Sequence, residues 1–577
     1  MTDAKDRFNL SILFLLLIVS TLVEMIGIGS IPIFAMVIFE PNLIIEKIPS
    51  YFNFEFILEV DKKKLTLYSS MIILFIFLLK NIYLGFFNYF NVYTIQRIRS
   101  NLYNKMFNNY IQSNYEFHIK RNPADLIRNI TTEVSKAVHY MMSFILLIKE
   151  SLIMIMIFLL LLIADTYVSI FIFSILGFFS VIFFIFTRKG SKIRGKKIQE
   201  YWGKQIKVLN HALGSIKQIK ILNKENFMYD LFKDNTDIIV KYDFIQSFLV
   251  TLPRLFLETV TILAVVTVSI TFVFSDRLIE SFVPLIVLIT VSAVRLIPSF
   301  NTISSSLATI KYQKPSFDLI LKELEDMKKI ISKNQIFHSN KLGKRNINFK
   351  NSIDIKNLVY FYPGTKKTII NDISFSISFG DVIGFAGESG EGKSTLLDLI
   401  TGLLIPSKGK ILVDGYDINE SYNNWRLLMG YVPQEIYLLD DSIKANIAFG
   451  AKDEEFNQKD FEKALELAQL FKFVEGLPEK ENTFVGDRGI RLSGGQKQRI
   501  GIARSLYLKP KILILDEPTS FLDIKNENLI LNDIYKLRET ITVIIISHRF
   551  GALKKCNKLF NIRNGKIKPI SNYNDLI

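Results

Sequence analysis

Cysteine and histidine are scarce in this chain. Among its 577 residues there is one cysteine, Cys556, and the five histidines are scattered along the sequence. A single cysteine cannot form an intrachain disulfide, which excludes a small secreted fold held together by disulfides. So few sulfur and imidazole groups also argue against a zinc site built from cysteine and histidine ligands.

Apolar and basic residues are abundant instead. Hydrophobic residues make up 49% of the chain, phenylalanine alone supplies 48 residues, and the formal net charge is +16. This composition excludes a disordered or collagen-like chain and argues against a purely soluble protein. The basic balance by itself suits nucleic acid, an anionic membrane or an acidic ligand, so the positions of the apolar residues must decide among them.

The apolar residues of the first half gather in six long segments. A helix needs about 20 consecutive apolar residues to cross the hydrocarbon core of a bilayer. We therefore predict six membrane spans, at Leu10–Phe39, Leu65–Phe90, Val138–Ala164, Tyr167–Phe186, Phe244–Phe274 and Phe282–Leu307. The first is not read as a cleavable signal peptide, because it is long, contains Glu24 and lacks a small-residue cleavage site.

The loops between these segments differ in charge. The two long loops, after the second and fourth segments, are rich in lysine and arginine, whereas the other loops mix basic with acidic residues. The positive-inside rule places both long loops and both chain termini in the cytoplasm. Topology thus explains much of the positive charge. Because no zinc-finger, helix-turn-helix or RNA-binding pattern accompanies it, no nucleic-acid partner is predicted.

The composition of the sequence changes near Ala308. We predict a transmembrane domain over residues 1–307 with long helical cytoplasmic loops, a charged linker over 308–351 and a soluble nucleotide-binding domain over 352–577. The predicted fold class is an all-α membrane domain of six helices fused to an α/β domain.

A glycine-rich loop carries the first chemical signal of the second half. It follows a short apolar run that reads as a buried strand, precedes a helix-like segment and matches the pattern G-x-x-x-x-G-K-[ST]. Backbone N–H groups of such a loop point at phosphate oxygens, Lys393 is expected to reach the β- and γ-phosphates, and Ser394 is expected to bind Mg²⁺. The predicted ATP-binding residues of the loop are Gly387, Glu388, Ser389, Gly390, Glu391, Gly392, Lys393, Ser394 and Thr395.

A second signal is an acidic pair at the end of another apolar run, residues 512–515. Asp516 and Glu517 follow this run directly, where a parallel strand would bring them beside the phosphate loop. Asp516 suits Mg²⁺, and Glu517 suits the general base that orients the attacking water.

Between the two lies the stretch Leu-Ser-Gly-Gly-Gln, on which the chain resembles the ATP-binding cassette (ABC) family. The resemblance implies ATP contacts for Ser493, Gly494, Gly495 and Gln496. The other family motifs appear in the family's order. They imply an adenine contact for Tyr362, a Mg²⁺-sensing and catalytic role for Gln434, a contact near the nucleotide for Asp523 and a γ-phosphate contact for His548.

The resemblance also implies a dimer. In the family the signature serine and glycines face ATP held by the phosphate loop of the other subunit, so Ser493 and Gly495 would not serve the ATP of their own chain. Since every motif is present, two identical chains would make two competent sites. A homodimer is therefore expected, and a heterodimer stays open.

Three cations lie inside the predicted spans: Lys80, Arg254 and Arg295. Each costs roughly 2.5–3.5 kcal/mol at the centre of a membrane helix, so we expect them to bind an anionic group of the cargo. Alternatives remain open, because Glu258 can neutralise Arg254 from one turn away and Lys80 can reach toward an interface.

The segments Pro253–Glu258 and Val294–Asn301, together with the external loop Pro41–Lys64, are similar to bacterial PglK-type flippases of lipid-linked oligosaccharides. That resemblance implies an amphipathic, polyprenyl-pyrophosphate-linked sugar as cargo, contact with membrane lipid, and a location in the inner membrane of a bacterium. An exporter of drugs, other lipids or peptides is the alternative, followed by an ATP-gated channel or a regulator without cargo.

Overall fold

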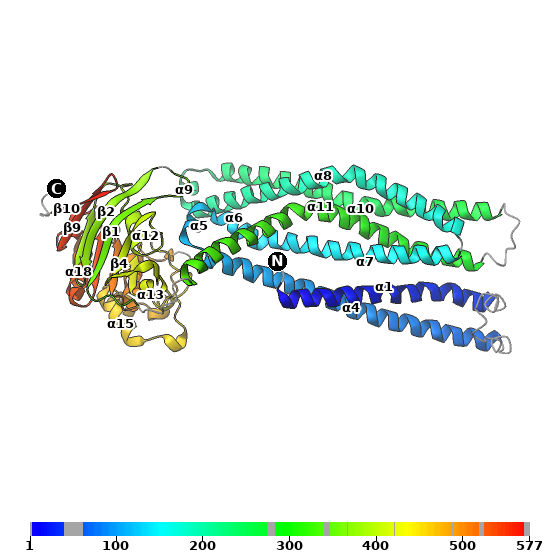
Figure 1. The fold of residues 1–577 in the computed structure, drawn as a ribbon, viewed down its shortest axis with the longest axis horizontal. Helices are drawn as coiled ribbons and strands as arrows, with labels where there is room; N and C mark the ends of the chain where they lie inside the picture. Colours follow the sequence, from blue (N-terminus) through cyan, green and yellow to red (C-terminus); the bar gives the residue numbers. More distant parts are fainter. Residues whose placement is uncertain are drawn as a thin grey trace. The chain divides into compact units, whose positions relative to one another are not determined.

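The structure is a computed structural model, shown in Figure 1. It describes residues 3–39, 62–164, 166–273, 283–339, 347–365, 367–420, 422–486, 489–518 and 524–570. The chain divides into two compact units, one of Met1–Ser113 with Phe117–Ser332 and one of Asn114–Glu116 with Lys333–Ile577. We call them the helical unit and the nucleotide unit.

Long α-helices build the helical unit. Its principal helices are α1 (Ala4–Phe39), α4 (Lys62–Gln112), α7 (Val134–Ala164), α8 (Thr166–Gly214), α10 (Glu225–Val273) and α11 (Val283–Ser339). Helix α1 packs with α4, both blue in Figure 1, and the teal α8 packs with the green α10. Helices suit these apolar stretches because every backbone polar group is satisfied inside the segment itself.

Shorter elements connect α4 to α7 and α8 to α10. They are α5 (Tyr115–Lys120), α6 (Pro123–Arg128), the π-helical turn η1 (Asn129–Glu133) and α9 (Ile216–Ile221). Helix α6 begins with a proline and is capped by Asn122, whose side chain accepts a hydrogen bond from the backbone N–H of Ala124. Proline at the first turn and an asparagine cap are both typical of helix starts.

The six predicted spans fall within the six principal helices, apart from Phe274 and Phe282, which lie outside the described residues. Over the described residues, the stretches Ala4–Ile38, Lys63–Gln112 and Pro123–Ile163 are long and apolar enough to cross a membrane by length and composition. The 57-residue α11 would be about 85 Å long at 1.5 Å per residue, far more than a bilayer core of about 30 Å. The long helices therefore continue well beyond any span.

The predicted linker over 308–351 differs most from the structure. Helix α11 runs on without a break to Ser339, so most of that segment is helix. Ile320, Leu324 and Met327 are buried in a core of the helical unit that also contains Leu102. Their spacing of four and three residues forms one apolar helical stripe, and the charged neighbours of that stripe are what make the segment resemble a linker.

Two sheets form the framework of the nucleotide unit. The smaller has the order β2 (Thr368–Ser378), β1 (Ser352–Phe361), β4 (Lys408–Val413), β5 (Tyr416–Asp417) and is antiparallel. The larger has the order β10 (Lys566–Ile570), β9 (Lys558–Arg563), β3 (Val382–Ala386), β8 (Thr542–Ile546), β7 (Ile512–Asp516), β6 (Met429–Val432). All of its neighbouring pairs are parallel except β10 with β9.

Strands β3, β7 and β8 are buried along their whole length, as is typical of parallel strands covered on both faces. Two separate cores of buried side chains contain alternate residues of these strands, for example Leu513 in one and Ile514 in the other. The helices of this unit are α12 (Lys393–Ile400), α13 (Tyr422–Leu427), α14 (Ile443–Ile447), α15 (Gln458–Leu467), α16 (Phe471–Glu475), α17 (Gly494–Tyr507), α18 (Ile524–Lys536) and α19 (Phe550–Leu553).

Candidate nucleotide site

Four adjacent parallel strands bring the predicted nucleotide residues to one edge of the larger sheet. In spatial order these strands are β3, β8, β7 and β6, and each is hydrogen-bonded to the next in parallel. Their carboxyl ends therefore meet at a common edge, where α/β sheets bind ligands. The phosphate loop follows β3, His548 follows β8, Glu517 follows β7 and Gln434 follows β6.

The phosphate loop has a backbone that only glycine adopts readily. Gly387, Gly390 and Gly392 have φ angles of 147°, 85° and 99°. A Cβ atom on Gly387 would lie 2.4 Å from the backbone oxygen of Ile562, so this position also has no room for a side chain. Residues Glu388, Ser389 and Gly390 are exposed, which leaves the crest of the loop open to a ligand.

Lys393, the first residue of α12, folds back over this loop. Its Nζ atom donates hydrogen bonds to the backbone oxygens of Gly387 at 2.9 Å and Glu388 at 2.7 Å. Burial lowers the pKa of Lys393, and the nearby carboxylates of Glu517 and Asp516 act in the opposite direction. The ammonium group thus lies inside the curl of the loop, where a phosphate could replace the two carbonyl contacts. Ser394, beside it, is exposed.

Tyr362 lies against the start of α12. Its hydroxyl is 3.2 Å from the hydroxyl of Thr395, which is buried. The Tyr362 ring meets the ring of Tyr360 edge-on, with centroids 5.2 Å apart. These contacts hold an aromatic surface next to the phosphate loop. At the other end of the loop, Glu391 accepts a hydrogen bond from the backbone N–H of Asn564.

Glu517 occupies the centre of the site. The side-chain amide of Gln434 donates to its Oε2 atom at 2.8 Å, and Nε2 of His548 lies 3.1 Å from Oε1. The structure therefore brings together three residues that are spread over more than 100 positions of the sequence. Glu517 also has a φ of 49°, a left-handed conformation that costs energy in a residue with a side chain.

Asp516, at the end of β7, is buried and accepts a hydrogen bond from the hydroxyl of Tyr431 at 3.3 Å. Burial raises the pKa of Asp516, and the bond from Tyr431 opposes the change. The pKa of Asp398 in α12 is raised to about 6, mainly by burial and then by the charge of Asp516. Asp516 with Ser394 and Gln434 supplies the oxygen ligands that Mg²⁺ prefers.

Sequence reasoning missed several groups that support the site. Tyr431 and Asp398 contact or influence Asp516, and the Gln498 side chain donates to the backbone oxygen of Glu517 at 3.1 Å. No spacing rule marks these residues, because their neighbourhood depends on strand order. The only available signal was their adjacency to recognised motifs.

The signature residues begin helix α17. Ser493 caps this helix, with its hydroxyl accepting from the N–H of Gln496 at 3.3 Å, while the Gln496 side chain accepts from the N–H of Ser493 at 2.8 Å. Ser493 and Gly494 are exposed and Gly495 is half-buried, so this helix start remains accessible within the unit. Asp523 lies outside the described residues.

Arg295, predicted to face an anionic cargo, is instead held by carboxylates of its own unit. Its Nη2 atom is 2.8 Å from Oε2 of Glu24 and 3.2 Å from Oε2 of Glu150. Lys80 is half-buried, with Nζ 4.8 Å from the centre of the Phe77 ring. Arg254 lies in α10, and its side chain is outside the described part of the structure. Lys149 lies over the Phe87 ring, with Nζ 5.2 Å from its centre.

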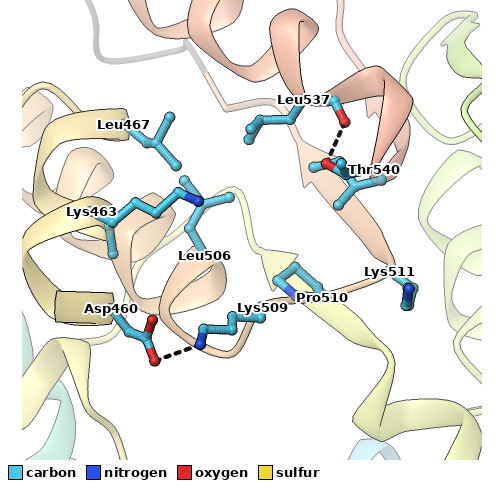
Figure 2. A pocket seen from close by; sticks show the side chains of 11 residues that line it. Asp460, Lys463, Leu467, Leu506, Lys509, Pro510, Lys511, Leu537 and Thr540 are labelled. Carbon is cyan, nitrogen blue, oxygen red and sulfur yellow. Dashed lines mark hydrogen bonds and ion pairs between the residues drawn. The ribbon is translucent and has the colours of Figure 1, made fainter. Parts of the chain in front are cut away.

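A cavity of about 290 Å³ in the nucleotide unit is separate from this site. Figure 2 shows Lys509 paired with Asp460, 2.7 Å apart, and Leu467, Leu506 and Leu537 around the space. The cavity borders Lys511 and Ile541, which precede β7 and β8, whereas Glu517 and His548 follow these strands. It therefore lies at the opposite edge of the sheet from the phosphate loop.

Fold and site together define a P-loop nucleotide-binding domain fused to a bundle of membrane-type helices. A family model of the ABC transporter matches residues 370–520, and a model of the ABC transporter transmembrane region matches residues 10–294. The chain belongs to the ABC transporters and has the plan of an exporter half-transporter. The predicted fold class is confirmed.

Similar proteins agree with this assignment. Residue identity is 28% over 492 residues with the ATP-dependent lipid A-core flippase of Wigglesworthia glossinidia brevipalpis, covering 84% of this chain and 81% of that protein. It is 37% over 285 residues with the heterocyst differentiation ATP-binding protein HepA of Nostoc sp., covering 49% of this chain and 45% of HepA. For the alpha-hemolysin translocation protein HlyB of Escherichia coli O157:H7 the identity is 41%, covering 41% of this chain and 34% of HlyB.

The chain thus matches less than half the length of HepA and HlyB. Among solved structures, a bacterial Atm1-family ABC exporter with ATP bound has the same fold, with a TM-score of 0.76 and 19% identity, covering 100% of this chain and 96% of that one.

Proposed function

We propose that the protein hydrolyses ATP and uses the energy to export or flip an amphipathic substrate across a bacterial inner membrane, with the nucleotide unit and both termini in the cytoplasm. The observation that carries the ATPase part is the placement of Glu517 between Gln434 and His548, beside the phosphate loop on adjoining strands. A carboxylate so held can take the proton of an attacking water molecule, which is the task of a general base.

Each group then has a chemical task. Lys393 and the N–H groups of residues 387–395 bind the phosphates of ATP. His548 contacts the γ-phosphate while its ring stays paired with the carboxylate of Glu517. Mg²⁺ held by Ser394, Asp516 and Gln434 would neutralise phosphate charge. The Tyr362 ring provides a surface on which adenine stacks. The transport cycle needs a two-state element, which closing and reopening of two nucleotide units supplies.

We further propose a homodimer in which Ser493 and Gly495 of one chain complete the ATP site of its partner. Support comes from the accessible start of α17 in the isolated unit. Mixing two inactive variants tests the arrangement. A dimer of one Lys393→Ala chain and one Ser493→Ala chain has one site with both defects and one intact site, so ATPase activity should partly return. If each chain worked alone, mixing would restore nothing.

For the cargo, we propose a lipid with an acidic head group, and specifically a polyprenyl-pyrophosphate-linked oligosaccharide. The short similarities at residues 253–258 and 294–301 support this proposal, and so does the similarity to a lipid A-core flippase over most of the chain. The three cations predicted to meet the head group differ in how available they are to it, because Arg295 is already paired with Glu24 and Glu150.

Reconstituted vesicles test the cargo. A labelled lipid-linked oligosaccharide should move to the opposite leaflet only with ATP, and a Glu517→Gln protein should not move it. Movement of lipid A or a neutral drug in place of this lipid would contradict the specific cargo while leaving the exporter function intact. ATPase activity without movement of any lipid, drug or peptide would favour a regulator.

A further inference from the structure

Four polar side chains form a connected cluster inside the helical unit. They are Glu24 of α1, Glu150 of α7, and Arg295 and Ser299 of α11. Arg295 donates through Nε and Nη2 to Glu24 at 3.1 and 2.8 Å, and through Nη1 to the Ser299 hydroxyl at 3.1 Å. The Ser299 hydroxyl in turn donates to Oε2 of Glu150 at 2.7 Å, so the serine connects the arginine to the second carboxylate.

Within the cluster, the two carboxylates are less exposed to solvent than the guanidinium. The carboxylate side chains of Glu24 and Glu150 are each 9% exposed, whereas the Arg295 side chain is 24% exposed. Ser299 is fully buried. An incoming group can therefore approach the guanidinium from its exposed side, but it would find most of the N–H donors already used.

Lys80 of α4 supplies a second positive charge beside this cluster. A Cβ atom on Gly27 would lie 3.0 Å from the Lys80 ammonium nitrogen, and Gly27 is one helical turn after Glu24. Lys80 interacts electrostatically with both Glu24 and Arg295. Two cations and two carboxylates from four helices thus form a group without net charge, which is the arrangement that makes buried charge tolerable.

We propose that Glu24 and Glu150 are internal counter-ions that the acidic group of the cargo must displace from Arg295. The two carboxylates then set the charge requirement of the transport site. An uncharged lipid cannot replace them, because it would leave Arg295 buried without an anion. An anionic head group can replace them, and the release of α1 and α7 from α11 accompanies its binding. This inference rests on the proposed function, in which the cargo is an acidic lipid.

Weakening the internal competitor should strengthen binding of the cargo. In full-length protein in lipid nanodiscs, polyprenyl pyrophosphate is titrated while ATPase activity is measured, with uncharged polyprenol as the comparison. Glu24→Gln and Glu150→Gln should each lower the half-stimulating concentration of the pyrophosphate about tenfold, since a charged hydrogen-bonding competitor becomes neutral. Polyprenol should not stimulate any of the proteins. Glu325→Gln, at an exposed carboxylate of α11, is the matched control and should match wild type.

Ser299→Ala is a second test of the counter-ion role, in case the glutamine variants do not fold. It keeps every charge and the direct contact of Arg295 with Glu150 but removes a hydroxyl that bonds to both, and it should lower the half-stimulating concentration two- to threefold. If wild type responds and neither glutamine variant nor Ser299→Ala changes the half-stimulating concentration, the counter-ion role is overturned while the acidic cargo stands. If wild type does not respond to polyprenyl pyrophosphate, the acidic cargo fails and the counter-ion role fails with it.

Discussion

The two units use the same kinds of charged residue in opposite ways. In the nucleotide unit, His548 is exposed beside Glu517 at the sheet edge, and the buried Lys393 donates to neutral backbone oxygens that a phosphate can replace. In the helical unit, Arg295 is enclosed by Glu24 and Glu150, and its charge is satisfied within the unit. A cation that looks available in a sequence can therefore be a ligand site or an internal ion pair.

The difference comes from the surroundings of each charge. The crest of the phosphate loop is exposed, and the partners of Lys393 there are neutral backbone oxygens, so a phosphate can reach this cation without displacing a carboxylate. Inside a bundle of apolar helices an unpaired guanidinium costs several kcal/mol, and any carboxylate within reach is drawn into contact with it. The comparison between an open and a closed charge cluster can be tested by substitutions in both units.

The largest effect is expected at Glu517. Glu517→Gln keeps the hydrogen-bonding shape but removes the base, so the ATPase rate should fall by about 10²-fold or more while ATP binding persists. Steady-state ATPase and nucleotide-binding assays measure the two properties. Glu435→Gln, at an exposed carboxylate three residues after the buried Val432, should be close to wild type. Near-normal turnover in Glu517→Gln would remove Glu517 as the base.

Arg295→Gln tests the closed cluster. It leaves two buried carboxylates without their cation, a change that costs about 3–5 kcal/mol for a buried pair. The thermal unfolding temperature of the purified protein should fall markedly, and a triple variant with Glu24→Gln and Glu150→Gln should recover much of the loss. An unchanged unfolding temperature for Arg295→Gln would mean that the arginine is as free as the residues of the open site.

Gly387→Ala probes the backbone of the open site. The added Cβ would lie 2.4 Å from the oxygen of Ile562, so the phosphate loop must shift. We expect ATP affinity to fall about tenfold, measured with a fluorescent ATP analogue, because small displacements of the N–H groups weaken each phosphate contact. Gly415→Ala is a control for positive φ alone, since Gly415 has a φ of 85° and open space around it. Equal ATP affinity in both variants and wild type would show that the loop tolerates a side chain.

Asp398 gives the smallest expected effect. Its pKa of about 6 in the folded protein lies above the ordinary value of 3.8, so the folded state holds this proton more tightly than the unfolded state. The stabilisation is present at low pH and is lost as the pH rises from about 4 to about 6. Asp398→Asn should therefore increase the free energy of unfolding at pH 7 by about 1 kcal/mol, a value reduced because this group is partly exposed. The unfolding temperature should rise accordingly at pH 7 and stay unchanged at pH 4. A gain at both pH values would assign the effect to another cause.

Much of the nucleotide unit was predictable because its motifs are local. The glycine pattern at residues 387–395 and the acid pair after residues 512–515 each imply a strand end, and parallel strands bring their ends together. The contacts of Glu517 with Gln434 and His548 required the strand order, which no local pattern contains. The predicted linker differs from the structure for a related reason, since Leu324 and Met327 are recognisable as core residues only in the folded helical unit, where they share a core with Leu102.

By itself, the sequence determined which segments are apolar enough to span a membrane and which loop has the backbone to hold phosphate, because both properties depend on neighbours in the chain. Only the tertiary structure decided which carboxylates Arg295 meets and which side chains surround Glu517. Those contacts join helices or strands that are distant in sequence, and their energies depend on the burial that packing creates.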